Sequence, residues 1–297
     1  MPKAIIGHIR NARATRSSRV AAAHPDVITK EPSTFVELDE ALAELNAAGV
    51  NRLILNGGDG TIREVLTRAG TIWGSNQPDY VILPNGNTNL IARKAGGVQG
   101  KDAITRIAEA NSDAFKRRTL RMLTATRTDM PNLTGFIMGA GAYETATRIA
   151  QEQIEARHNL QILITIRRLL TSSELRQGAE IGLSIDGGEE NSRSRMAVML
   201  TSFTGPLLMG LNPFWGGDGP IRLLDVDTKP PRLLLSAPFL AFGAPRRWMS
   251  NAYRSGPAQQ VTLRLTTPFV MDGERFDPGS DGLVHINATK TATFLSL

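Results

Sequence analysis

The chain has 297 residues, of which 41% are apolar and 21% are charged. This balance is typical of a globular protein, and the length suffices for two modest domains or one large one. The absence of cysteine excludes disulfides and thiolate metal sites. A formal charge of +6 favours an anionic partner such as a nucleotide, a nucleic acid or an anionic lipid.

No segment of the sequence has the pattern of a targeting signal or of a membrane span. Residues 1–6 run directly into a strand-like segment and lack the apolar core of a signal peptide. No apolar run reaches the roughly 18 residues that a spanning helix needs. Basic residues are dispersed rather than interleaved with aromatic ones, which argues against nucleic-acid binding. We therefore predict a cytoplasmic protein without a nucleic-acid partner.

The first 50 residues predict the start of an α/β domain. Residues 4–9 and 27–29 have the composition of short strands, and the basic loop 10–19 lies between them. Ser33 or Thr34 is a suitable N-cap for a helix whose apolar residues recur at helical spacing until Gly49. Strands that alternate with helices indicate a parallel sheet with helices on its faces.

The most informative stretch follows. An apolar strand at residues 53–55 runs into Gly57-Gly58-Asp59-Gly60-Thr61 and then into a helical pattern. Strand, glycine turn and helix form the layout that points backbone N–H groups at a phosphate. Asp59 would repel a phosphate, so it suggests a metal bridge or proton transfer, with a plain turn as the alternative. We expect Asp59 to be exposed, so that its replacement leaves the fold intact.

A second turn of the same kind follows the next predicted strand. Residues 80–83 read as a buried strand and lead into Pro84-Asn85-Gly86-Asn87-Thr88-Asn89, after which a helix begins. The carboxyl ends of parallel strands meet at one edge of a sheet, where open α/β folds bind their ligands. We therefore expect both turns to line one ligand site. Residues 101–111 predict a further amphipathic helix.

The pattern changes to β-type after about residue 118. Short strands alternate with Gly, Asn and Pro turns, and a long helical segment at residues 143–172 interrupts them. Residues 139–142 do not form a dinucleotide fingerprint, and we interpret their glycines as close packing at a helix start. The predicted strands span residues 120–126, 135–138, 180–185, 196–201, 222–227, 261–265 and 283–286.

Three segments resemble the diacylglycerol kinase catalytic-domain family, which includes bacterial lipid kinases and sphingosine and ceramide kinases in a superfamily with NAD kinases. Gly57 to Thr61 match the family's GGDGT motif in full. Pro84 to Asn89 match its PxGTxN motif, except that Asn87 stands in place of Thr, with Thr88 next to it. Asp272-Gly273-Glu274 match its DGE motif, although two acids around a glycine could equally form a hairpin turn.

The resemblance implies a two-domain fold. Residues 1–118 would form an α/β nucleotide-binding domain with a Rossmann-like parallel sheet and flanking helices. Residues 119–282 would form a β-sandwich that holds the lipid substrate. Residues 283–297 would supply a final strand that returns to the interdomain cleft and packs on the first domain.

The resemblance also implies roles for individual residues. Glu274 would be the general base for the acceptor hydroxyl and Asp59 would organise a metal or a water, or these roles would be reversed. The family's structural metal loop has no transferable counterpart in residues 216–225, so no metal ligand is assigned. Nucleotide contacts are implied for Asn11, Thr29, Gly57, Gly58, Asp59, Gly60, Thr61, Asn87, Thr88 and Asn89.

The implied reaction transfers the γ-phosphate of ATP, with Mg²⁺, to the hydroxyl of a neutral lipid. Diacylglycerol, ceramide and a sphingoid base are all candidate acceptors. An NAD kinase is an alternative, and so is a catalytically inactive lipid-binding or regulatory module, because Asn87 departs from the motif. A homodimer is also compatible with the sequence.

A lipid acceptor requires contact with a membrane, and residues 231–253 are the candidate surface. In this segment apolar residues precede Arg246, Arg247 and Trp248, a combination that suits insertion at an anionic interface. The alternative is an ordinary buried helix of the second domain. We predict a cytoplasmic protein that associates peripherally with anionic lipid.

Overall fold

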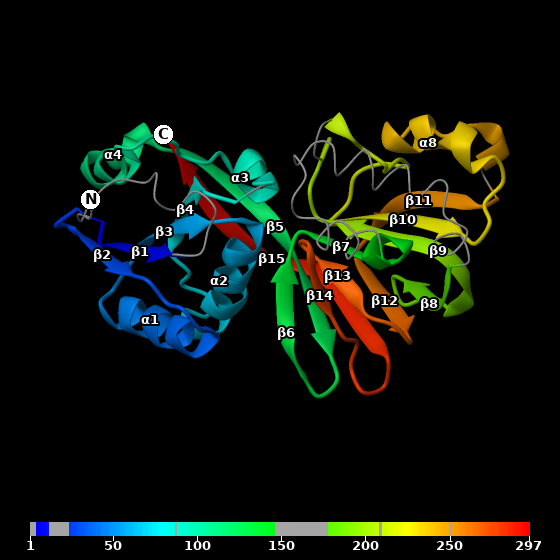
Figure 1. Ribbon diagram of the computed structural model, residues 1–297, viewed down its shortest axis with the longest axis horizontal. Helices are drawn as coiled ribbons and strands as arrows, with labels where there is room; N and C mark the ends of the chain where they lie inside the picture. The colour runs from blue at the N-terminus through cyan, green and yellow to red at the C-terminus, as the bar shows by residue number, and fades with distance from the viewer. Residues whose placement is uncertain (1–3, 12–23, 87, 146–177, 208–209, 250) are drawn as a thin grey trace. The chain divides into compact units, whose positions relative to one another are not determined.

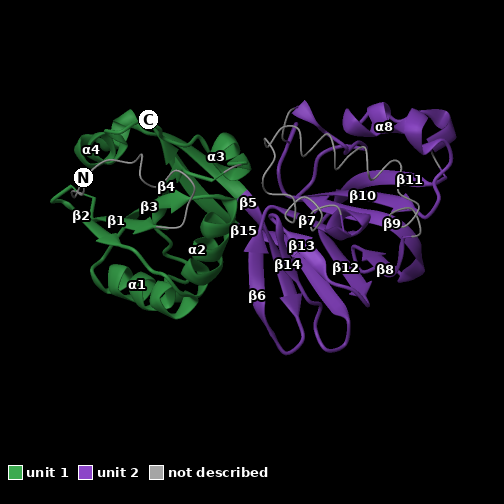
Figure 2. Cartoon of the chain, viewed as in Figure 1, with its two compact units in different colours: residues 1–120, 291–297 green, residues 121–290 purple. Residues whose placement is uncertain are grey.

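The computed structural model describes residues 4–11, 24–86, 88–145, 178–207, 210–249 and 251–297. The chain forms two compact units (Figure 2), of which unit 1 comprises residues 1–120 and 291–297 and unit 2 comprises residues 121–290. The chain passes from one unit to the other within β5 (Lys116–Arg127) and within β15 (Leu283–Ser296). Residues 283–290 therefore belong to unit 2, and the last seven residues, 291–297, belong to unit 1.

Unit 1 is an α/β structure whose strands lie in the parallel order β2-β1-β3-β4, with Phe294 of β15 beside Tyr80 of β4 (Figure 1). The central strand β3 is buried along its whole length, as expected where helices cover both faces of a parallel sheet. The strands are β1 (Ile6–Arg10), β2 (Val27–Lys30), β3 (Arg52–Gly57) and β4 (Asp79–Pro84). The helices are α1 (Phe35–Ala47), α2 (Asp59–Ile72), α3 (Leu90–Ala95) and α4 (Ala103–Glu109), followed by a 3₁₀ turn (Ser112–Ala114).

The predicted elements of unit 1 are confirmed, with small shifts at their ends. Thr34 is the N-cap of α1, because its hydroxyl accepts the backbone N–H of Glu37 at 3.2 Å. The Glu37 carboxylate in turn accepts the backbone N–H of Ser33 at 2.7 Å. Gly49 ends the segment with a positive φ of 74°, a conformation that costs glycine least.

Unit 2 consists mainly of antiparallel strands, so the predicted fold class is confirmed (Figure 1). Strands pair in the order β14-β13-β7-β9-β8-β12-β15, while β10 pairs with β9 and β11, and β6 pairs with β5. Among the described helices, none is both long and apolar enough to cross a membrane. The strands besides β5 and β15 are β6 (Met130–Gly135), β7 (Ile137–Gly141), β8 (Ala179–Ile185), β9 (Asn191–Thr201), β10 (Ile221–Asp227), β11 (Tyr253–Ala258), β12 (Gln260–Leu265), β13 (Phe269–Met271) and β14 (Glu274–Phe276), and the helical segments are α8 (Leu233–Ala241) and a 3₁₀ turn (Arg247–Met249).

The sequence analysis located most strands of unit 2 but not all. The predicted strand 135–138 spans the end of β6 and the start of β7, and the structure interrupts it only at Phe136. Strand β11 was not predicted, because Gly256 and Pro257 are uncommon inside strands. Pro257 is tolerated there because β11 pairs with β10 alone among the described strands. Of the predicted helix 143–172, residues 146–172 lie outside the described residues, and residues 143–145 are helical.

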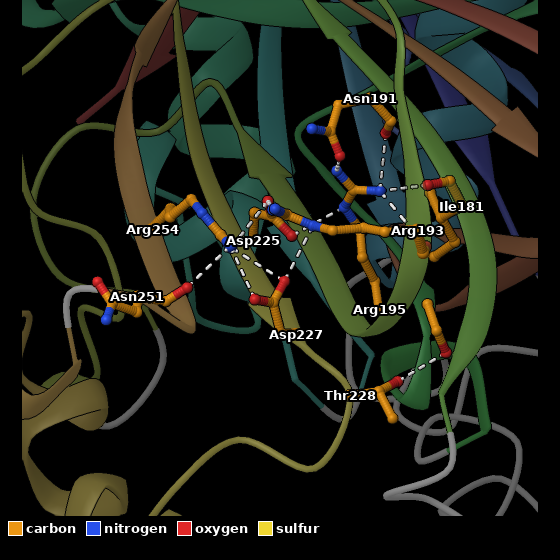
Figure 3. Close-up of polar contacts among 10 residues, drawn as sticks. Ile181, Asn191, Arg193, Arg195, Asp225, Asp227, Thr228, Asn251 and Arg254 are labelled. Carbon is orange, nitrogen blue, oxygen red and sulfur yellow. Dashed lines mark hydrogen bonds and ion pairs between the residues drawn. The ribbon is translucent and has the colours of Figure 1, made fainter.

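A cluster of arginines and aspartates lies on the β9–β10–β11 side of unit 2 (Figure 3). The Asp225 side chain is 3% exposed and forms ion pairs with three arginines. These are Arg193, Arg195 at 3.0 Å and Arg254 at 3.5 Å. Asp227 forms ion pairs with Arg193 at 2.9 Å and with Arg254 at 2.7 Å. Each of these two carboxylates therefore forms ion pairs with guanidinium groups.

Other acids near this cluster give no sign of a metal site either. Asp218, in the segment compared with the metal loop, is 74% exposed and lies 3.7 Å from Arg222. Across the described part of the chain, no group of three or more His, Cys, Asp or Glu residues could hold a metal ion. The described acids in the 216–225 segment therefore serve ion pairs.

Replacing Asp225 with Asn is expected to destabilise unit 2 by about 3–5 kcal/mol, because the buried Arg195 loses its counter-ion. Urea unfolding followed by circular dichroism measures this loss. The matched control is Glu189→Gln, which removes an exposed charge of unit 2 and should cost less than about 0.5 kcal/mol. Equal stabilities of the two variants would contradict the structural role of Asp225.

Candidate active site

The two glycine turns predicted to form a site lie side by side at the carboxyl ends of β3 and β4. Gly57 and Pro84 are register partners, and the Asn85 N–H donates to the Gly57 carbonyl at 3.0 Å. Gly58 and Gly86 touch back to back, since a Cβ built on Gly86 would lie 2.4 Å from the Gly58 Cα. Neither turn could approach the other if Gly86 carried a side chain. The structure thus brings the two motifs together as predicted.

Helix α2 begins at this edge without a side-chain cap. Gly58 is its N-cap, has an extended backbone, and offers no side-chain acceptor to the first N–H groups of this 14-residue helix. Such N–H groups, aligned with the helix dipole, suit an anionic ligand. Gly57 is confined as well, because a Cβ there would lie 2.6 Å from the Thr61 Cβ.

Asp59 joins the first turn to the helix that follows the second. Its two carboxylate oxygens accept the N–H of Leu90 at 2.9 Å and the N–H of Ile91 at 3.0 Å, at the start of α3. Asn89, the N-cap of α3, has a φ of 49° and makes no side-chain cap itself. Asp59 therefore caps α3 from 31 residues away in the sequence. The expectation that Asp59 is exposed is wrong: it is half-buried and occupied by these two bonds.

Opposing influences act on the pKa of Asp59. Burial raises the pKa of its carboxyl, and the bonds from Leu90 and Ile91 and the charge of Arg93 oppose this shift. Arg93 is an exposed cation of α3 and was not singled out from the sequence. The signal that could have found it is a basic residue in the helix directly after the second turn.

The second turn is closed by its own side chains. The Asn89 carboxamide accepts the Gly86 N–H at 2.9 Å and donates to the Gly86 carbonyl at 2.7 Å. Asn85 donates to Asn56 in a buried amide pair that the sequence analysis did not anticipate. Thr88 is half-buried within the turn. The remaining predicted contact, Asn87, lies outside the described residues.

Asn11 and Thr29 were predicted as nucleotide contacts on neighbouring strands. Asn11 lies at the site: its side chain donates to the Thr61 hydroxyl at 2.8 Å, and its N–H donates to the Asn56 carbonyl at 3.0 Å. The Thr29 hydroxyl instead lies 3.2 Å from Nδ1 of His8. Burial, with the nearby Arg10, lowers the pKa of His8 to about 4, so this imidazole is neutral at neutral pH.

The Asp272-Gly273-Glu274 motif belongs to unit 2. Asp272 and Gly273 form the two-residue turn of the β13–β14 hairpin, with φ values of 48° and 86° that are typical of a type I′ turn. The Asp272 carboxylate accepts the N–H of Phe136 at 2.9 Å and the N–H of Ile137 at 2.8 Å. Asp272 is therefore a structural residue, while Glu274, half-buried, follows it as the first residue of β14.

Two further polar side chains of unit 2 lie around this hairpin and were not predicted. Burial, followed by the charge of Asp272, raises the pKa of Tyr143 to about 12. Glu144 forms an ion pair at 3.1 Å with Arg275, the neighbour of Glu274. The Tyr143 ring also excludes a side chain at Gly139, where a Cβ would lie 2.2 Å away. This contact confirms close packing at the start of a helix.

Asp59→Asn is expected to lower the stability of α3 by about 1–3 kcal/mol, because an amide nitrogen then faces a backbone N–H. Amide hydrogen exchange should become faster at Leu90 and Ile91. The matched control is Asp102→Asn, which removes an exposed acid before α4. Unchanged exchange at Leu90 and Ile91 would show that the carboxylate does not hold α3.

The segment that contains the two glycine turns matches the model of a known protein family. Residues 5–118 match the family model described as the diacylglycerol kinase catalytic domain. No curated protein matches the chain.

Solved structures from Bacillus anthracis str. Sterne share the fold. One, provisionally named a diacylglycerol kinase, has a TM-score of 0.69 and 17% identity, covering 100% of this chain and 98% of its own. Another, named a diacylglycerol kinase, has a TM-score of 0.61 and 14% identity, covering 98% of this chain and 96% of its own. Residues 5–118 therefore resemble a diacylglycerol kinase catalytic domain, and this match supports a lipid kinase.

Proposed function

We propose that the protein transfers the γ-phosphate of ATP to the hydroxyl of a neutral lipid. The observation that carries this proposal is the junction of the two glycine turns. There Gly58 and Gly86 touch, and Asp59 fixes the start of α3, within the segment that matches the catalytic domain. A compact edge of N–H donors of this kind supports phosphate binding without a P-loop lysine.

The proposal assigns the nucleotide to residues of unit 1. Gly57, Gly58 and Gly60 allow close approach of the phosphates, and the first N–H groups of α2 supply donors. The exposed Arg93 would neutralise phosphate charge. The side chains proposed to contact the nucleotide are Asn11, Thr29, Asp59, Thr61, Asn87, Thr88 and Asn89.

Mg²⁺ would enter as a complex with ATP. Magnesium is held mainly by phosphates and waters, with one or two carboxylates from the protein. Asp59 accepts one N–H bond on each oxygen, so lone pairs remain for a magnesium ion or its waters. This donor set fits an ion that arrives with the nucleotide better than a resident metal.

Proton removal from the acceptor hydroxyl is assigned to Glu274, with Asp59 as the organiser of metal or water. A carboxylate within hydrogen-bond reach of an alcohol acts as a base in the transition state. The raised pKa of Asp59 also supports the reversed assignment, in which Asp59 takes the proton.

The candidate functions differ in the molecule that accepts the phosphate. Diacylglycerol follows from the name of the matching family, and ceramide or a sphingoid base would present the same hydroxyl chemistry. An NAD kinase and an inactive lipid-binding module are the alternatives. We also propose that the protein reaches its acceptor as a cytoplasmic, peripheral membrane protein, with a homodimer as a further option.

The test is a transfer assay with radiolabelled ATP and Mg²⁺. Diacylglycerol, ceramide, sphingosine and NAD are supplied separately, the lipids in mixed micelles. We expect label in at least one lipid and none in NAD. Label in NAD alone would overturn the lipid assignment, and no label in any acceptor would favour the inactive module.

Glu274→Gln is expected to lower turnover by ~10²-fold or more with little change in the KM for ATP, because the group acts on the acceptor. The matched control is Glu180→Gln, which neutralises an exposed acid on β8 of the same unit. A higher KM for ATP with turnover retained at saturation would instead make Glu274 a nucleotide or metal contact.

A further inference from the structure

A cationic apolar face lies on α8 and the turn that follows it in unit 2. We call this the α8 surface. Leu234, Leu235 and Phe242 are 65%, 62% and 64% exposed, which is unusual for side chains of this size. The α8 surface comprises Arg232, Leu234, Leu235, Phe242, Arg246, Arg247 and Trp248, all of which are exposed.

The opposite side of α8 is fixed to the core of unit 2. Leu233 and Ser236 are buried, and Trp248 donates from Nε1 to the Ser236 hydroxyl at 3.3 Å. The Tyr253 hydroxyl donates to the Pro231 carbonyl at 3.1 Å before the helix begins. The apolar side chains are therefore presented by an anchored element. The expectation of an ordinary buried helix is wrong for this face.

Positive charge surrounds these apolar side chains. Residues 229–249 contain Lys229, Arg232, Arg246 and Arg247 and no acidic residue. The Arg232 guanidinium lies 5.9 Å from the Trp248 ring centroid, and that of Arg246 lies 4.4 Å from the Phe239 centroid. Stacked in this way, the arginines keep their charge at the level of the apolar face.

Unit 1 carries an apolar patch of the opposite electrostatic kind. Phe35 and Val36, at the start of α1, are exposed to a similar degree. The flanking segment 31–44 contains five acids and no basic residue, while Arg68 of α2 stacks on the Phe35 ring at 4.8 Å and pairs with Asp39. Its acidic residues are Glu31, Glu37, Asp39, Glu40 and Glu44. Charge therefore distinguishes the α8 surface from this patch.

We propose that the α8 surface docks the protein on an anionic bilayer, with Leu234, Leu235 and Phe242 inserted below the headgroups. Exposed apolar side chains, a tryptophan and several arginines match the two attractions of such an interface, apolar burial and electrostatics. The proposal rests on the lipid substrate of the proposed function, but vesicle binding requires no catalysis and is measured separately.

The experiment is vesicle co-sedimentation of the full chain. Vesicles are made of phosphatidylcholine alone or of an equal mixture of phosphatidylcholine and phosphatidylserine. Binding should appear with the mixture, be weak with phosphatidylcholine, and fall as salt screens the arginines. Salt-independent binding equal on both vesicles would overturn the proposal.

Charge reversal tests the arginines. Arg246→Glu/Arg247→Glu should weaken partitioning by about 25-fold or more, since each basic residue contributes about fivefold near an anionic surface. The control Lys101→Glu/Lys290→Glu changes the net charge equally at exposed positions outside the α8 surface and should bind nearly like the parent. If both variants lost vesicle binding equally, net charge alone would explain the effect, and the assignment to the α8 surface would be overturned.

Insertion is tested with Leu234→Ser/Leu235→Ser, which should bind at least about tenfold more weakly, because apolar burial is lost. The matched control is Phe35→Ser/Val36→Ser in unit 1, which should bind normally. Brominated lipid should quench tryptophan fluorescence in the parent and less in Trp248→Phe.

A second copy of the chain is the competing occupant of the α8 surface. Suppose that the parent forms a dimer and binds no vesicles, and that Leu234→Ser/Leu235→Ser is a monomer. The α8 surface would then be a dimer interface, and the membrane proposal would be overturned. Vesicle binding without kinase activity would preserve this inference and remove the proposed function.

Discussion

The candidate site depends on one carboxylate. Asp59 stands at the start of α2, yet its two oxygens bind the first N–H groups of α3 at 2.9 and 3.0 Å. This contact sets the position of the second glycine turn against the first, so that two motifs distant in sequence present one surface. An acid in a phosphate turn would be unfavourable in isolation, and the capping role gives it a structural reason to be there.

Opposing influences act on the ionisation of the same carboxylate. Burial raises its pKa, while the two N–H bonds and Arg93 stabilise the ionised form. The start of α3 therefore stabilises the charge of the acid that caps it.

Local signals in the sequence predicted local structure well. Thr34 was identified as a cap because capping needs only Thr34 and residues one turn away, and strands ending at Gly57 and Pro84 were visible from apolar runs. The partners of Asp59 and the arginine cluster around Asp225 were not predicted, because those contacts join residues about 30 positions apart. Such pairs follow from strand order and register, which composition and periodicity do not specify.

The two acidic motifs, one in each unit, share one structural feature. In each motif both carboxylate oxygens of an aspartate accept backbone N–H groups of a neighbouring segment. Asp59 accepts those of Leu90 and Ile91. Asp272 accepts those of Phe136 and Ile137. A tight turn with φ above zero then positions the residue after Asp272-Gly273, and that residue is Glu274. The aspartate of this second motif builds the turn, which leaves the glutamate as the acid whose position the turn determines. Asp59 and Asp272 therefore share one structural task, and Glu274 follows directly after the turn that Asp272 stabilises.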